Sequence, residues 1–573
     1  MIDSRKATQV ARVAGCLMLL GSAVSLLAQE KTWQGVAIGA AAIAGAWLCS
    51  LALTRRSGAA SIVVAGMLVL LSVGSAFKQA WLQQPLLATD FAYFTGDLAA
   101  NLSILERYPM LTGRVAAGLA LFAAMLGWAL WFEAPIHLRS APMRVPSRGG
   151  SMLAGVAVLA FAAPNAEPVQ QSKFEAVVRP WFFLAERGNV LSRFVMSFRR
   201  LHVEAPPRNF ASGVNEFAAF TPDPKPPAGY PDIILWHDES TFDPAMLSGC
   251  TAPECNVRMF RPDADTAASG LLRVHTFGGW SNSAEFALLT GMSHRVFGEG
   301  SIFAHFTLAP RVQRSLPLLL KKYGYRTVAV YPNQRNFLNA ERAYRHYGFD
   351  EFYDIGDLGL PNDIWAITDR AMYGGMRRIV DEHRGGPLLI YVLTQYQHGP
   401  HDQRLSRLPE GFRSLKLPES LGPSARVSLS NYLYRISLSD AVIGDLETAL
   451  IRGDRSRRRV FLHYGDHQPF LDGHMEKLAK RGLDDLPGAA RDYVTSFSVK
   501  TNFAPVVKES HPFVDISLLA GLLLDVAGIP KDEYFSANAK LRAKCDGGYL
   551  DCGKQDVVAR YHDYVFHDLR VFE

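Results

Sequence analysis

The chain has 573 residues, 49% of them hydrophobic and 20% charged, and its formal net charge is +6. This length exceeds one ordinary domain, and apolar runs crowd the first third of the sequence, whereas charged residues concentrate after about residue 170. Since no basic block is interleaved with aromatic residues, we expect no nucleic-acid partner and attribute the excess charge to membrane topology.

Five apolar stretches predict membrane-spanning helices, because most of them approach the ~20 residues that cross a bilayer. They cover residues 8–28, 33–53, 59–77, 115–132 and 151–163, and the last of them is short. Several stretches in succession favour a membrane anchor over a cleaved signal peptide, which the first stretch alone could be. Basic residues such as Arg12, Arg55 and Arg144 fall in alternate loops, so we expect the residues after 164 outside the cytoplasm.

The cysteines agree with this topology. Two of them lie in the apolar stretches and four form close pairs in the part expected outside, Cys250 with Cys255 and Cys545 with Cys552. An oxidising compartment would permit two local disulfides. A metal site built from these four cysteines is the alternative, but the Cys-x-x-Cys spacing is missing.

Residues 166–229 are expected to connect two domains. Within them, residues 179–203 have a composition suited to an amphipathic helix on the membrane surface, and an ordinary packing helix is the alternative. A proline-rich linker that cannot form a regular element follows at 205–229. The expected domains are a transmembrane domain of five helices at 1–165, a juxtamembrane segment with the linker at 166–229, and a catalytic domain at 230–573.

After residue 230, short β-branched or aromatic runs alternate with helical patterns. We predict strands at 232–236, 271–277, 327–331, 388–393 and 460–464, and helices at 312–323, 365–383 and 427–450. This alternation predicts an α/β domain with a mostly parallel central sheet and helices on both faces. Ligands of such sheets bind beyond the carboxyl ends of the strands, so the residues that follow each strand are the candidate site.

Two of these strand ends carry groups that admit two interpretations. The first strand exits through Glu239, whose carboxylate could bind a metal or only cap the next helix. After the second strand, a glycine-rich turn leads to Ser281 and to a helix expected to begin at Asn282. Ser281 could be a nucleophile beside a phosphate bound at the helix start, or a capping hydroxyl. Asn282 and Glu285 fit an N-cap arrangement, so we interpret Glu285 as structural.

The strongest local signal follows the strand at 460–464, where Asp466 and His467 are adjacent in a tight turn. A carboxylate and an imidazole delivered together favour a divalent metal over a capped turn with a surface histidine. His474 lies further along the chain, and His398 and His401 follow the strand at 388–393. These imidazoles could bind phosphate oxygens or transfer protons, although each histidine by itself is more often structural or exposed.

With these residues in this order, the chain resembles the membrane phosphoethanolamine and phosphoglycerol transferases of the alkaline phosphatase and sulfatase superfamily, which include lipoteichoic acid synthases. The resemblance covers the whole layout, with membrane spans first and a sulfatase-like domain after them. It implies that His398 contacts the transferred group, that His474 more loosely matches a later family histidine, and that Ser281 is the nucleophile. It also implies one divalent metal ion, zinc or manganese, with four ligands, Glu239, Ser281, Asp466 and His467.

Two departures from the family narrow the expected reaction. Where lipoteichoic acid synthases carry a Trp and an Arg that hold glycerol phosphate, this chain has Leu338 and Ala340, which moves the preference toward phosphoethanolamine. Sulfatases need a Cys or Ser followed by x-Pro-x-Arg to make formylglycine. Residues 281–285 lack both the Pro and the Arg, so we do not expect sulfatase chemistry.

The predicted function is the metal-dependent transfer of a head group from a membrane phospholipid donor to a periplasmic or outer-leaflet glycan or lipid acceptor, through a phosphoserine at Ser281. Phosphoethanolamine is favoured over phosphoglycerol. The resemblance places such an enzyme in a bacterial inner membrane, with its catalytic domain in the periplasm. The alternatives are a sulfatase-like phosphodiesterase that uses water as its acceptor, and a membrane-anchored binding protein that has lost catalysis.

Overall fold

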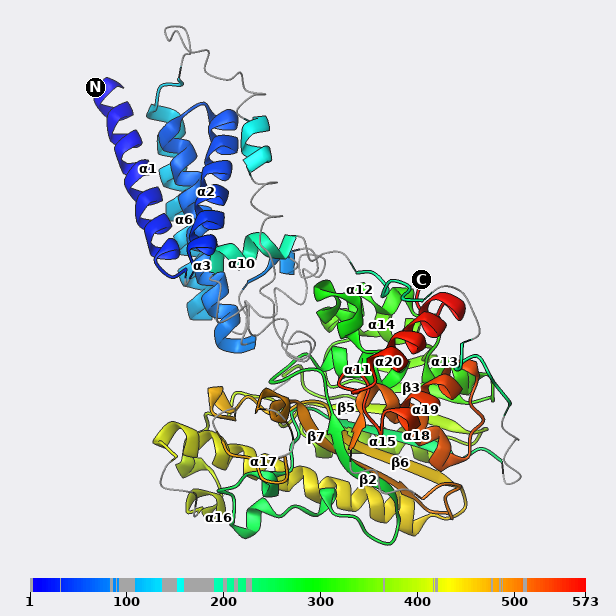
Figure 1. The fold of residues 1–573 in the computed structure, drawn as a ribbon. Coiled ribbons are helices and arrows are strands. Elements are labelled where there is room, and N and C mark those ends of the chain that lie inside the picture. Colours follow the sequence, from blue (N-terminus) through cyan, green and yellow to red (C-terminus); the bar gives the residue numbers. More distant parts are fainter. Residues whose placement is uncertain are drawn as a thin grey trace. The chain divides into compact units, whose positions relative to one another are not determined.

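The computed structural model describes residues 4–30, 32–82, 86–88, 90–91, 109–136, 152–158, 190–198, 203–210, 215–222, 229–363, 366–415, 417, 421–475, 478–483, 486, 488–508 and 513–573. The chain divides into two compact units, Met1–His202 and Val203–Glu573 (Figure 1). Each unit is described by itself.

The first unit is helical. Its described helices are α1 (Ser4–Leu27), α2 (Trp33–Thr54), α3 (Ser57–Leu82), α6 (Pro109–Phe132) and α10 (Val190–Ser197). Four stretches are long and apolar enough to cross a membrane: Arg5–Leu27, Trp33–Thr54, Ser57–Ala76 and Thr112–Phe132. These confirm four of the five predicted spans. The fifth, at 151–163, is helical over 152–158, and its remaining residues lie outside the described part of the chain, as does Arg144.

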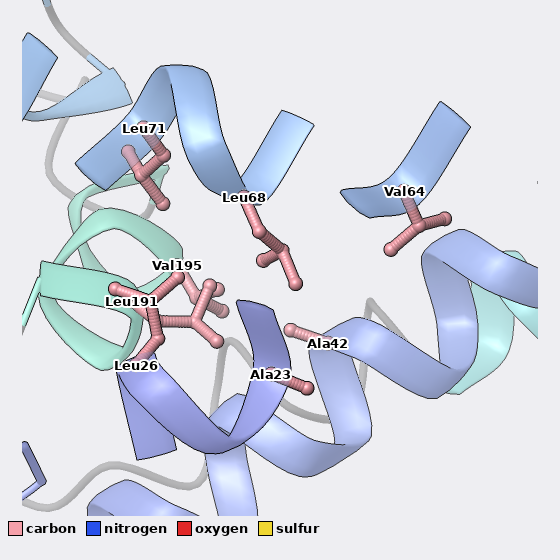
Figure 2. Packing of buried hydrophobic residues seen from close by; sticks show 8 residues of the cluster. All are labelled: Ala23, Leu26, Ala42, Val64, Leu68, Leu71, Leu191 and Val195. Atoms are coloured by element: carbon pink, nitrogen blue, oxygen red, sulfur yellow. The ribbon is translucent and has the colours of Figure 1, made fainter. Parts of the chain in front are cut away.

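Buried aliphatic side chains join α10 to the longer helices (Figure 2). Leu191 and Val195 of α10 pack into one cluster with residues from α1, α2 and α3, namely Ala23, Leu26, Ala42, Val64, Leu68 and Leu71. The segment predicted at 179–203 is thus a packing helix over Val190–Ser197, which supports the alternative to a surface-lying helix there. Residues 179–189 and 199–202 lie outside the described part.

A buried carboxylate organises the start of α3. Glu133 accepts hydrogen bonds from the backbone N–H groups of Gly58 and Ala59, at 3.1 and 3.0 Å. Arg12 Nε of α1 lies 3.1 Å from the same carboxylate. A negative charge at the first turn of a helix is favourable, because the amide groups there lack partners within the helix. Glu133 therefore ties α1, α3 and the end of α6 together.

The second unit is built on an eight-stranded sheet of order β4-β3-β5-β1-β6-β7-β2-β8. The strands are β1 (Asp232–Asp238), β2 (Thr266–Arg273), β3 (Arg326–Val330), β4 (Glu351–Tyr353), β5 (Leu388–Thr394), β6 (Arg459–Gly465), β7 (Val494–Thr501) and β8 (Phe513–Asp515). Every residue of β1, β5 and β6 is buried, as expected of central parallel strands covered on both faces.

The predicted sheet is confirmed as mostly parallel, with two corrections. Among the described strands, β7 alone runs antiparallel to its neighbours, β6 and β2. The strand predicted at 271–277 lies earlier, as β2, because its end turns into the glycine-rich segment that precedes α11 (Ser281–Thr290). The other four predicted strands match β1, β3, β5 and β6.

Helices cover both faces of the sheet (Figure 1). They include α13 (Leu316–Lys321), α15 (Asp369–Glu382), α17 (Pro423–Leu446), α18 (Ile516–Ala527), α19 (Glu533–Lys544) and α20 (Gln555–His562). The first three match predicted helices. Successive side chains of β1 point to opposite faces. The charge of His237 accordingly acts on Glu285 of α11, and that of Asp238 acts on Asp369 of α15.

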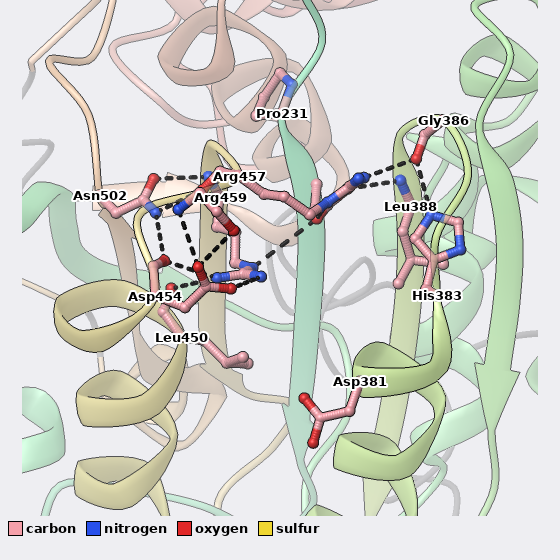
Figure 3. A network of polar contacts seen from close by, with 12 residues as sticks. Pro231, Asp381, His383, Gly386, Leu388, Leu450, Asp454, Arg457, Arg459 and Asn502 are labelled. Carbon is pink, nitrogen blue, oxygen red and sulfur yellow. Dashed lines mark hydrogen bonds and ion pairs between the residues drawn. The ribbon is translucent and has the colours of Figure 1, made fainter.

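The amino ends of the central strands are joined by ion pairs (Figure 3). Arg457 donates to both oxygens of Asp232 at the start of β1, over 2.6 and 2.5 Å. Asp232 also accepts from the backbone N–H of Leu388 at the start of β5, over 3.0 Å. Arg459 of β6 pairs with Asp454 at 2.6 Å. A carboxylate that is only 4% exposed is thus neutralised by guanidinium groups of its own chain.

Both expected local disulfides are present in the second unit. Cys250 bonds to Cys255 and Cys545 bonds to Cys552, with Cα atoms 5.7 and 5.3 Å apart. These close pairs fasten loops of a few residues each. A metal site built from the four cysteines is therefore ruled out in this structure.

Candidate active site

The candidate residues lie after strands whose carboxyl ends meet at one edge of the sheet. Glu239 follows β1, His398 follows β5, and Asp466 with His467 follows β6. Since β1 pairs in parallel with both β5 and β6, the three segments leave the sheet side by side. This arrangement is the one that the sequence predicts for a ligand-binding edge.

Ser281 is the first residue of α11 and directly follows a strained turn. Gly278, Gly279 and Trp280 all have positive φ, at 67°, 155° and 72°. Trp280 is a bulky residue in a left-handed conformation, and such strain concentrates at functional sites. The ring of Phe303 packs edge-on against Trp280 with centroids 5.0 Å apart. The backbone is thereby forced to present Ser281 at the helix start.

The expected N-cap at Asn282 is wrong. The N-cap residue is Trp280, which makes no side-chain capping bond, and the helix begins at Ser281. Asn282 instead donates through Nδ2 to the carbonyl of Ile302 over 3.2 Å. The turn before the helix is tighter than the sequence pattern suggested, because both glycines adopt positive φ. The Ser281 hydroxyl therefore does not occupy the capping position.

Ser281, Glu239 and Asp466 are brought together. Hydrogen bonding from the Ser281 hydroxyl lowers the pKa of both carboxyl groups. Burial nevertheless raises the pKa of Glu239 well above its usual range, and the charges of Asp466 and Glu285 add to this effect. Burial also acts to raise the pKa of Asp466, but His467 and His237 outweigh it and bring that pKa to about 2. The buried carboxyl groups here thus outnumber the positive charges that neighbouring side chains provide.

The His467 imidazole turns a lone pair toward the Asp466 carboxylate, so each side chain offers an atom that could bind a metal ion. His467 Nδ1 lies 3.0 Å from the carbonyl of Gln468, so Nδ1 carries the proton and Nε2 carries the lone pair. Nε2 is 3.4 Å from Asp466 Oδ2 and is buried without a hydrogen-bond partner. Oδ2 itself lies 3.0 Å from Nε2 of His237. Asp466 Oδ1 is held by the backbone N–H of Ser240 over 2.8 Å. A lone pair facing a carboxylate oxygen suits a cation between them.

Gly465 allows this turn to form. A Cβ atom at Gly465 would lie 2.1 Å from the carbonyl oxygen of Thr241, which is closer than any real contact. The chain after β1 therefore passes directly over the end of β6. This close approach places Glu239 beside Asp466 and His467.

The donor set fits a divalent ion by its chemistry. Within the described residues, no group of three or more His, Cys, Asp or Glu side chains is already arranged as a metal site. The fit rests instead on the unpartnered Nε2 of His467, on the Asp466 carboxylate beside it, and on the excess of buried carboxyl groups around Glu239. Carboxylate, hydroxyl and imidazole donors suit zinc and manganese.

His398 reaches the site from the β5 side. Its Nε2 lies 3.6 Å from Glu239 Oε1, and its Nδ1 lies 2.5 Å from the carbonyl of Gly399. Burial lowers the pKa of His398, so its imidazole is neutral near pH 7. Arg435 of α17 donates to the carbonyls of His398 and Pro400, over 2.6 and 3.0 Å, and so holds the loop that carries the imidazole.

The other two candidate histidines contact a loop carbonyl and a helix hydroxyl. His401 is buried and its Nε2 lies 2.9 Å from the carbonyl of Gln397, while burial lowers the pKa of His401 to about 3. It fastens the loop instead of facing the site. His474 Nε2 lies 3.2 Å from the hydroxyl of Ser424 on α17. In the described part of the chain, the contact of His474 is thus with a residue of a helix.

Two buried residues beside the candidate site are ones that the sequence did not single out as site residues. His237, on β1, lies with Nε2 3.0 Å from Asp466 Oδ2. Glu285, interpreted from the sequence as a helix cap, is 1% exposed and contacts His305 Nε2 at 3.1 Å and the hydroxyl of Tyr344 at 2.5 Å. The signal that could have found them is spacing. His237 lies on β1 two residues before Glu239, and Glu285 lies four residues after Ser281 on α11.

Comparison with known proteins agrees with this architecture. Residues 253–529 match the family model described as Sulfatase. An uncharacterized protein of Haemophilus influenzae is 32% identical over 353 residues, which are 60% of this chain and 62% of that protein. Lipoteichoic acid synthase 1 of Bacillus subtilis is 24% identical over 212 residues, which are 35% of this chain and 31% of that protein. This chain thus spans less than two thirds of the length of either relative.

Among solved structures, the integral membrane protein lipooligosaccharide phosphoethanolamine transferase A of Neisseria meningitidis has a TM-score of 0.47 and 11% identity, over 82% of this chain and 84% of that one. The family model and the sequence relatives confirm the predicted resemblance to sulfatase-like proteins, among them a lipoteichoic acid synthase. This chain carries N-terminal apolar helices followed by a sulfatase-like α/β domain, in which residues 253–529 match the Sulfatase family model.

Proposed function

We propose that this protein transfers a phospholipid head group, with phosphoethanolamine favoured, to a hydroxyl of a glycan or lipid acceptor through a phosphoserine at Ser281. The observation that carries the proposal is the convergence of Ser281 with Glu239 and Asp466 at the start of α11. A hydroxyl that is not used for capping and that contacts two buried carboxyl groups is poised for nucleophilic chemistry.

The proposed metal ligands are Glu239, Ser281, Asp466 and His467. A divalent ion held there would lower the pKa of the Ser281 hydroxyl and polarise the phosphate of the donor lipid. The lone pair of His467 Nε2 and Asp466 Oδ2 are the two donors whose orientation is already fixed, by Gln468 and Ser240 respectively. Zinc and manganese both suit this set.

In the first step, Ser281 Oγ attacks phosphorus, the Oγ–P bond forms, and the P–O bond to diacylglycerol breaks. The serine proton passes to the departing oxygen of diacylglycerol, so atoms and charge balance. His398 is the proposed carrier of this proton, because its imidazole is neutral near pH 7 and lies 3.6 Å from Glu239. In the second step, the acceptor hydroxyl attacks the phosphoserine, its proton returns to Ser281 Oγ, and the Oγ–P bond breaks.

The head-group preference rests on the loop after β3. Leu338 and Ala340 stand where the resemblance implies a Trp and an Arg around glycerol phosphate. Leu338 and Asn339 both adopt left-handed conformations, with φ of 50° and 60°. Asn339 Nδ2 donates to the carbonyl of His305 over 3.0 Å. This hydrogen bond ties the loop to the short helix Ala304–Thr307, which follows α11 in the chain. Without the guanidinium, the loop has fewer donors for glycerol hydroxyls.

We also propose that the protein lies in a bacterial inner membrane with its second unit in the periplasm. The two disulfides and the alternation of basic residues between apolar stretches support this orientation. A membrane anchor would keep the active site and the donor lipid at high effective concentration.

Release of diacylglycerol tests the proposed function. The full-length protein in detergent should release diacylglycerol from phosphatidylethanolamine faster when a hydroxyl-bearing acceptor is added, and S281A should release none. Equal release of free head-group phosphate without acceptor would favour a hydrolase. Unchanged release by S281A would refute the nucleophile.

A further inference from the structure

A second layer of polar residues lies beneath the candidate site. His237 lies on β1 and precedes by two residues Glu239, which directly follows the strand, so His237 lies roughly 6–7 Å deeper along the chain. The same strand is otherwise apolar from Ile233 to Trp236. His237 is fully buried, and burying an imidazole is unfavourable unless its ring nitrogens have partners.

Three adjacent strands hold the His237 imidazole. Its Nδ1 lies 2.5 Å from the hydroxyl of Tyr391 on β5, and that hydroxyl lies 3.4 Å from the hydroxyl of Tyr464 on β6. The rings of His237 and Tyr464 have centroids 4.9 Å apart. Because β5 and β6 flank β1, the imidazole is fixed from both sides.

The other ring nitrogen faces the candidate metal ligand. His237 Nε2 lies 3.0 Å from Asp466 Oδ2, while Asp466 Oδ1 accepts from the backbone of Ser240 over 2.8 Å. The Asp466 carboxylate is thus contacted at each oxygen by a group that cannot move, which blocks its rotation about the Cβ–Cγ bond. Partners of this kind around metal ligands raise metal affinity by holding the ligand in one orientation.

We propose that His237 is a positioning residue that orients Asp466 for metal binding. The inference rests on the proposed function, because it assumes that Asp466 is a ligand. This role depends on one ring nitrogen of His237. A substituted side chain can contact Asp466 only if it has a polar atom where Nε2 stands, because a polar atom where Nδ1 stands would not reach the carboxylate.

Two polar substitutions separate this role from a merely structural one. The amide nitrogen of a glutamine at position 237 lies near the place of imidazole Nε2, whereas that of an asparagine lies near the place of Nδ1. H237Q should therefore keep most of the metal affinity of the full-length protein in detergent. H237N and H237F should each lose about 10- to 100-fold, the usual effect of removing a partner of a metal ligand.

The readout is zinc and manganese binding by competition with a chelator, together with the number of ions bound, and D466A is the reference. Equal affinities of H237Q and H237N in folded proteins would overturn the inference, as would wild-type affinity of H237F. If D466A also binds metal like the wild type, the proposed metal site fails instead. A wild type that binds two ions and an H237Q variant that binds one would make His237 a ligand and overturn its positioning role.

Discussion

Buried carboxylates at the two edges of the central sheet have different partners. At the amino edge, Asp232 is paired with Arg457 through two short bonds, and its charge is neutralised within the chain (Figure 3). At the carboxyl edge, Glu239 and Asp466 face a hydroxyl and imidazoles, and burial raises the pKa of Glu239. The difference indicates that the first edge stabilises the fold, whereas the second is arranged for an added cation.

The largest expected effect comes from removing a carboxylate at the carboxyl edge. D466A should lose more than about 100-fold in metal affinity, because it deletes a proposed ligand, whereas deleting a partner of a ligand costs ~10–100-fold. Metal analysis of the purified full-length protein checks this. If D466A binds as much metal as the wild type, the carboxyl edge is not the metal site, and the proposed difference between the two edges is wrong.

The next effect concerns the loop that carries His398. R435M removes the donors to the carbonyls of His398 and Pro400 and should lower the rate of head-group transfer by about 10- to 100-fold, because small displacements of a reacting group are costly. Metal affinity should stay at the wild-type level, and R435K should recover part of the rate. Loss of metal by R435M would show that the loop and the metal site are not separable.

A smaller effect is expected at the amino edge. R457M leaves the Asp232 carboxylate buried with Arg459 Nε at 3.9 Å. The free energy of unfolding should fall by about 2 kcal/mol, less than the ~3–5 kcal/mol of a fully buried pair, because Arg457 is partly exposed. Chemical denaturation measures this change. As a control, R457M should bind metal with the affinity of the wild type. A reduced affinity would mean that a change at the amino edge alters the metal site at the carboxyl edge.

The smallest effect is a pH dependence. Asp369 at the start of α15 is buried beside Asp238, and burial raises its pKa to about 7 from the ordinary 3.8. The folded state then holds a proton that the unfolded state releases, so this group makes the protein less stable as pH rises from about 4 to 7. D369N should flatten that part of the stability profile. A slope identical to that of the wild type would exclude Asp369 as its source.

The sequence pattern predicts the strands that are apolar throughout and misses those whose burial depends on partners. β1, β5 and β6 read as continuous apolar runs and were predicted. β7 was not, because it carries Thr495 and Lys500, which are buried against polar partners far along the chain. Lys500 Nζ, for example, lies 2.7 Å from Glu447 on another element.

The site follows the same rule. Glu239, Ser281, Asp466 and His467 were identifiable because each follows an apolar strand or a glycine-rich turn. His237 was not, since its partner Asp466 comes from a strand far along the chain. Glu285 matched a capping pattern, but the helix begins at Ser281 after the left-handed Trp280, and Glu285 is buried within it.

The phosphoserine at Ser281 is tested most directly by the intact mass of the metal-loaded protein after exposure to phosphatidylethanolamine or phosphatidylglycerol. We predict an adduct with the mass of phosphoethanolamine, located on Ser281 and absent from S281A and D466A. An adduct that persists in S281A would contradict the account, and so would the lack of any adduct in a folded, metal-loaded wild type.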